Sequence, residues 1–71
     1  MRAEGSDEPV VVPAAVLEGL EAVRLSGANM VDRAHVLVVA YNMGYRQTVR
    51  WAEEHPHEYS RGIFHGFTAE G

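Results

Sequence analysis

Apolar residues recur with helical spacing along four stretches of the chain, and the first covers residues 13–26. Within it Val16, Leu20 and Val23 fall at positions i, i+4 and i+7, so their side chains share one face of a helix. The proline that begins this stretch suits a first helical position, because its missing N–H would have no partner there. Gly27 is a typical C-terminal stop. The pattern predicts a first helix over residues 13–26.

The second stretch covers residues 32–43 and is the most apolar. Asp32 is placed to cap its beginning, and Gly44 follows its end. Its valines would also suit a buried strand, but the length and the two end signals favour a helix. We expect this to be the central helix of the fold, with four residues facing inward: Val36, Val39, Ala40 and Met43.

A third helix is predicted from Tyr45 to about Glu54, and a fourth from Pro56 to a stop by Gly66. The third ends at His55, because a residue that precedes proline disfavours helical backbone. The predicted inward residues are Tyr45, Val49 and Ala52 in the third helix, and Tyr59 and Ile63 in the fourth.

Together these elements predict an all-α fold, a compact bundle of three to four short helices. Residues 1–12 are expected to form a flexible acidic leader, residues 13–67 a single helical domain, and residues 68–71 a frayed tail. The leader contains an apolar run of three β-branched residues, Val10, Val11 and Val12, which favours extended backbone. This run either lies across the helices or pairs with the same segment of a second chain.

With 71 residues and no cysteine, the chain can build only a thin core without disulfides. Association into a homo-oligomer and a reducing cytoplasm fit this composition. The sequence holds no apolar run long enough to cross a membrane, so no membrane partner is expected. The net charge of −4 disfavours general binding to nucleic acid, whose affinity comes from cations that neutralise phosphates.

The segment from Val36 to Trp51 also fits part of a helix-turn-helix pattern, with Ala40 four residues before the turn glycine. Its second helix offers three side chains of the types that read base edges or phosphates, Arg46, Gln47 and Arg50. An apolar residue is expected six positions after the glycine, but that position holds Arg50. The alternative interpretation is a solvated helix face, and the sequence favours it.

Other candidate chemistry is sparse. His55 and His57 flank Pro56 among several glutamates, but this spacing is not a known metal signature. The serines lack an evident base, and no glycine-rich loop follows a strand, so we expect neither an enzyme nor a bound cofactor. Four aromatic residues could line a small-ligand pocket, although core positions are the commoner role at helical spacing: Tyr41, Tyr45, Trp51 and Tyr59.

From about Val16 to Phe67 the chain resembles a family of very short proteins of unknown function, encoded mainly by bacteriophages and prophages. One residue departs from the pattern: Val31 stands where such proteins often have Phe. The matching residues are Val23-Arg24 with Gly27, Asn29-Met30-Val31-Asp32, Ala40 with Gly44-Tyr45, Trp51 with Glu54-His55, Glu58-Tyr59, and Ile63 with Gly66-Phe67. The resemblance implies an accessory phage protein in a host cytoplasm, and it brings no catalytic or binding residue with it.

The leading hypothesis is therefore a phage-type accessory protein that acts by protein contact, against a host or defence component. Its interaction surface is expected at Val10, Val11, Val12 and Trp51. A small helix-turn-helix DNA-binding regulator is the first alternative, and a protein that sequesters a small ligand is the second.

Overall fold

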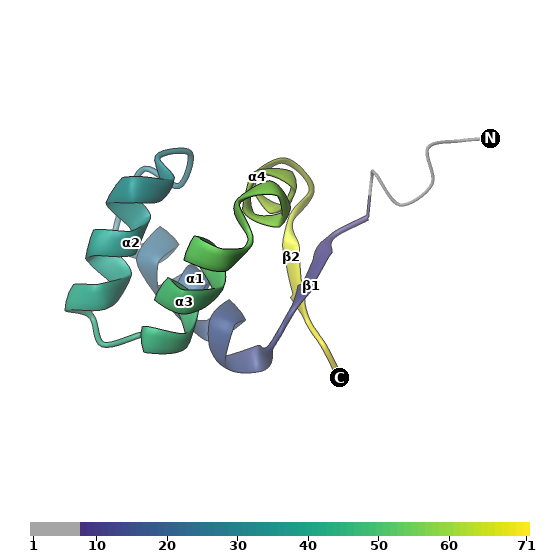
Figure 1. The fold of residues 1–71 in the computed structure, drawn as a ribbon, viewed down its shortest axis with the longest axis horizontal. Helices are drawn as coiled ribbons and strands as arrows, with labels where there is room; N and C mark the ends of the chain where they lie inside the picture. Colours follow the sequence, from purple (N-terminus) through teal and green to yellow (C-terminus); the bar gives the residue numbers. More distant parts are fainter. Residues whose placement is uncertain (1–7) are drawn as a thin grey trace.

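The computed structural model describes residues 8–71, so the first seven residues of the expected leader lie outside the described residues. Four helices are followed by a short strand, and another short strand precedes them (Figure 1). The elements are β1 (Val10–Val12), α1 (Ala14–Leu25), α2 (Arg33–Asn42), α3 (Arg46–Glu54), α4 (Pro56–His65) and β2 (Phe67–Ala69). All four predicted helices are present, each within about two residues of the expected bounds.

The two strands form a parallel pair, which corrects the all-α prediction to a mostly helical fold with a two-stranded sheet. Val10 lies opposite Phe67 and Val12 opposite Ala69. The valine run is thus an ordered part of the domain, not of a flexible leader, and the first two residues of the expected frayed tail, Thr68 and Ala69, belong to β2. Parallel strands need a long crossover connection, and the four helices supply it.

The central helix is α1, and the prediction that α2 would be central is wrong. Figure 1 shows α1 behind α3, with α2 on one side and the strands on the other. It buries Val16, Gly19, Leu20 and Val23, whereas α2 buries only Val36 and Ala40. Met43, expected to face inward, is 45% exposed.

The helix ends follow the signals in the sequence. Asp32 caps α2, where its carboxylate accepts a hydrogen bond of 3.2 Å from the backbone N–H of His35. Gly27 and Gly44 have φ values of 93° and 89°, a left-handed conformation that glycine adopts without strain. The loop before α2 is held to the core by Tyr59, whose hydroxyl donates a hydrogen bond of 2.6 Å to the carbonyl oxygen of Met30.

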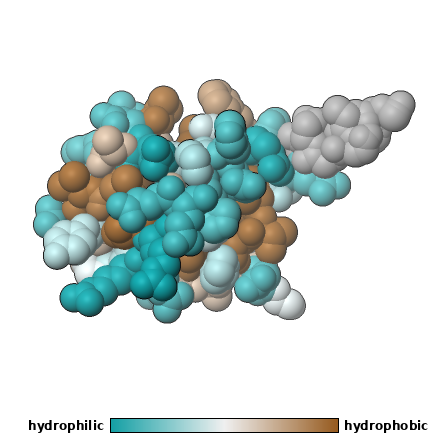
Figure 2. Space-filling view, in the orientation of Figure 1, coloured by the Kyte–Doolittle hydropathy of each residue, from teal (hydrophilic) through white to brown (hydrophobic). Residues whose placement is uncertain are grey.

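Hydrophobic and hydrophilic side chains are distributed unevenly over the surface. Figure 2 shows hydrophobic side chains at the end of the molecule where α2 lies and again beside the strands, with a hydrophilic band over α3 between them. Among the residues that are both large and exposed are Val31, Val38, Tyr41 and Phe64. None of the helices in residues 8–71 is long and apolar enough to cross a membrane.

Candidate binding site

The outer face of α3 is presented rigidly because its inner face packs closely on α1. Thr48 and Ala52 are the buried residues of α3. The Thr48 hydroxyl donates a hydrogen bond of 3.1 Å to the carbonyl oxygen of Val16. Opposite Thr48, Gly19 provides the space for this approach: a Cβ at Gly19 would lie 2.8 Å from the Thr48 Cβ. Gly19 therefore allows the close approach of α3 to α1.

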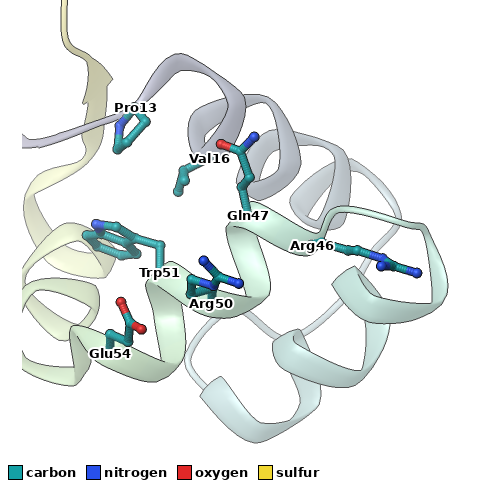
Figure 3. Close-up of a pocket in the computed structure, with 7 residues that line it drawn as sticks. All are labelled: Pro13, Val16, Arg46, Gln47, Arg50, Trp51 and Glu54. Carbon is teal, nitrogen blue, oxygen red and sulfur yellow. The ribbon is translucent and has the colours of Figure 1, made fainter.

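A pocket of about 400 Å³ lies between α3 and the beginning of α1 (Figure 3). We call this pocket the α3 pocket. Its lining combines an apolar wall with a polar rim. In Figure 3 the Trp51 ring lies across the pocket from Pro13, Gln47 extends toward α1, and Arg46 points away from Trp51. The lining residues are Pro13, Val16, Arg46, Gln47, Arg50, Trp51 and Glu54.

Trp51 is half-buried, and two neighbouring aromatic rings fix its orientation. The His55 ring stacks on it with centroids 5.0 Å apart and an interplanar angle of 18°. Phe67 of β2 meets it edge-on at 6.0 Å. Nδ1 of His55 also lies 2.9 Å from the Trp51 carbonyl oxygen, which holds the stacked ring in place. The indole is therefore a preorganised apolar surface, of the kind that contributes strongly to protein recognition.

Charge is divided along the exposed face of α3. Arg46 and Arg50 occupy its first half, whereas Glu53 and Glu54 occupy its last turn. This face can bind a partner that offers both signs of charge. It is less suited to a uniformly anionic partner, because the glutamates would repel it.

The sequence pattern that defines a family described as "Domain of unknown function (DUF5049)" matches residues 14–67, from the beginning of α1 to the beginning of β2. The chain belongs to the DUF5049 family. No curated protein matches the sequence, and no solved structure matches the fold. The family assignment agrees with the resemblance to proteins of unknown function and adds no activity to it.

The DUF5049 domain brings Arg46, Gln47, Arg50 and Trp51 to one site, although Trp51 was expected on a different surface from the other three. The other walls of the pocket were missed. Pro13 and Val16 are distant in sequence from α3. A glycine in the middle of a helix, such as Gly19, is the sequence feature that could have indicated the close approach of α1 and α3.

Most of the valine run cannot form an exposed interaction surface in this domain. Val10 and Val12 are buried against the helices, and only Val11 is exposed. Pairing with a second chain would use the outer edge of β1, which is flanked by Pro9 and Pro13. Proline has no N–H to donate, so the two prolines limit the length of any added strand.

The remaining candidate residues for metal or ligand binding do not come together at one site. Among residues 8–71 there is no group of three or more side chains that could together hold a metal ion, and the His55 ring is stacked on Trp51. Four aromatic residues were candidates for the lining of one ligand pocket. In the DUF5049 domain each of them lines a different pocket: Tyr41, Tyr45, Trp51 and Tyr59.

Proposed function

We propose that this protein is a phage-type accessory protein that acts by binding another protein, of the host or of its defence, through the α3 pocket. The observation that supports the proposal is the meeting of Trp51, Arg50 and Gln47 around one concave site. Tryptophan and arginine dominate the binding energy of protein interfaces, especially where a pocket excludes water. The fixed Trp51 ring would receive an apolar group of the partner, while Arg50 and Glu54 pair with charges around it.

Site-specific photo-crosslinking tests this proposal in bacterial cells that produce the protein. A photoreactive amino acid at Gln47, on the pocket rim, is expected to capture one discrete protein. The same amino acid at Ser60, an exposed position of α4, is the matched control and is expected to capture none. Equal capture at both positions, or none at position 47, would contradict the proposal.

The charge reversal Arg50→Glu is expected to weaken the captured interaction by about tenfold or more. Arg50 is exposed, so the fold should be unaffected, and circular dichroism checks this. Trp51→Ala should have a similar effect on binding, but it also removes the contacts with His55 and Phe67. The Arg50 variant is therefore the decisive one.

A second candidate function is DNA binding through the first half of α3. The observation that favours it is the exposure of Arg46, Gln47 and Arg50 on a helix that follows α2 after a tight turn at Gly44. A recognition helix reads base edges with its N-terminal residues, which is where these three side chains lie.

Amide NMR titration with mixed-sequence duplex DNA tests this alternative. DNA binding predicts shifts over residues 44–51 that weaken as salt rises, because phosphate contacts release counterions. Arg46→Ala and Arg50→Ala should each weaken the interaction and lower its salt dependence. An unperturbed spectrum at low salt would remove this candidate.

A further inference from the structure

A second depression lies beside the α3 pocket, between α3 and α2. Its volume is about 390 Å³, and we call it the α2–α3 depression. Three of its residues also line the α3 pocket, so one row of side chains on α3 borders both: Arg46, Arg50 and Glu54. The lining residues of the α2–α3 depression are Tyr41, Arg46, Val49, Arg50, Glu53 and Glu54.

Helical spacing places these two depressions on opposite sides of Arg50. The helix α3 packs on its neighbours through Thr48 and Ala52, which are buried. Because successive residues of a helix are turned by about 100°, Arg50 points directly away from this buried side. Val49 and Trp51 lie at equal angles to its left and right. Trp51 therefore faces the α3 pocket, and Val49 faces the α2–α3 depression.

Each of the two depressions presents an aromatic ring. Trp51 supplies it in the α3 pocket, and Tyr41 of α2, which is 66% exposed, supplies it in the α2–α3 depression. Tryptophan and tyrosine are enriched among the residues that dominate binding energy at protein interfaces. Both depressions can therefore receive an apolar side chain of the same partner.

Positive charge separates the two aromatic rings. Arg46 and Arg50 are exposed, and they are two of the six basic residues of a chain whose net charge is −4. An arginine side chain donates paired hydrogen bonds to a carboxylate, so an acidic side chain fits between the two depressions. The glutamates in the last turn of α3 would repel a run of acidic residues, so the fit is to a single one.

We propose that the protein partner presents a helix that crosses α3, with an apolar side chain in each depression and an acidic side chain on Arg50 between them. This inference rests on the proposed function and adds the chemistry of the partner. A helix with its side chains is about 10 Å wide, and residues i and i+7 of the crossing helix lie about 10 Å apart on one face. The partner sequence is therefore apolar at i and i+7, with Asp or Glu at i+3 or i+4.

Selection from a display library of random peptides, with the full chain immobilised, tests this pattern. Peptides of about 15 residues provide about four helical turns, which is enough to cross α3. Enriched peptides are expected to carry two apolar residues seven positions apart and an acidic residue between them. No enrichment, or enriched peptides that lack the second apolar residue or the acidic one, would overturn the proposal.

An exchange of charges tests the contact with Arg50. With one enriched peptide, Arg50→Glu should weaken binding by about tenfold or more, as measured by fluorescence anisotropy. Replacing the acidic residue of the peptide by lysine should weaken binding to the wild type and restore much of the binding to Arg50→Glu. A restoration that fails would overturn the assigned contact.

Tyr41→Ala tests the α2–α3 depression and should weaken binding of the same peptide by about tenfold. The matched control is Phe64→Ala on α4, which also removes an exposed ring but lies outside both depressions, and its affinity should equal that of the wild type. Circular dichroism checks that both variants keep the fold. Unchanged affinity of Tyr41→Ala would show that the partner uses the α3 pocket alone, contrary to the proposal.

Photo-crosslinking in bacterial cells separates this inference from the proposed function. A photoreactive phenylalanine derivative at Tyr41 keeps an aromatic ring there and is expected to capture the same protein as the photoreactive residue at Gln47. Capture at position 47 alone would overturn the inference and leave the proposed function standing. Capture at neither position would contradict the proposed function and the inference with it.

Discussion

Tyr59→Ala is expected to lower the free energy of unfolding by about 3–5 kcal/mol, which approaches the whole stability of a domain of this size. Tyr59 is only 2% exposed, and its ring packs 6.0 Å from that of Phe67. The substitution leaves a cavity between α4 and the strands and removes the hydrogen bond to Met30. Urea unfolding followed by circular dichroism at neutral pH measures the loss.

Tyr59→Phe separates the ring from the hydroxyl. It keeps the packing and leaves only the Met30 carbonyl oxygen without its donor, so a loss of about 1–2 kcal/mol is expected. If the two variants were equally unstable, the hydroxyl and not the buried ring would make the main contribution of Tyr59 to the free energy of unfolding. That result would contradict the prediction.

Comparison of the wild type with Tyr59→Phe is also expected to reveal a pH dependence of the free energy of unfolding. Burial raises the pKa of Tyr59 from 10.0 to about 12, with nearby Arg33 opposing the rise and Asp32 adding to it. Because the unfolded chain releases the Tyr59 proton at a lower pH than the folded protein does, the contribution of protonated Tyr59 to stability is complete below pH 10. It is lost as the pH rises toward 12. Tyr59→Phe should lack this component of the alkaline loss of stability.

Gly19→Ala is expected to destabilise the protein by about 2 kcal/mol, although alanine is the better helix former by about 1 kcal/mol. The added Cβ would lie 2.8 Å from the Thr48 Cβ and 3.0 Å from the Tyr45 Cβ, and closer still to the Thr48 hydroxyl. These atoms belong to the packed face of α3, so α1 and α3 must separate to admit it. Thermal and urea unfolding measure the change.

Two variants control this prediction. Ala15→Gly is an exposed substitution in the same helix and should show only the propensity effect, a loss of about 1 kcal/mol. In a Thr48→Ala background the effect of Gly19→Ala should shrink, because the nearest obstructing atom is gone. A Gly19→Ala protein more stable than the wild type would mean that propensity outweighs the close approach.

The helices were predictable because their ends are determined locally. Asp32 caps α2 through a bond to a residue three positions away, and Gly27 and Gly44 supply the left-handed conformations that end α1 and α2. Each of these signals depends on a few neighbouring residues, so it can be recognised from the sequence alone.

The strand pairing and the central helix were not predictable for the opposite reason. Val10 pairs with Phe67 across nearly the whole domain, and no local pattern encodes a partner at that distance. Similarly, α2 is more apolar than its burial requires, because Val38 and Met43 are exposed. Counting apolar residues measures how much a helix could bury and does not say which neighbours it meets.

The candidate site was predictable in part. Arg46, Gln47 and Arg50 were recognised because helical spacing alone places them on the outer face of α3. Their neighbours Pro13 and Val16 come from α1 and the residue before it, and they join the site only through the packing of Gly19 on Thr48. A site formed between two helices depends on that tertiary contact.

The parallel pairing of β1 and β2 determines how the domain responds to tension. A pull on the chain before Val10 and after Ala69 acts in opposite directions along two strands that run the same way. The backbone bonds between them, such as Val10 N–H to the Gly66 oxygen and Glu70 N–H to the Val12 oxygen, lie across that pull. They are loaded together rather than opened one at a time. The two short strands thus act as a mechanical clamp, and the helices can extend only after the strands have slid apart.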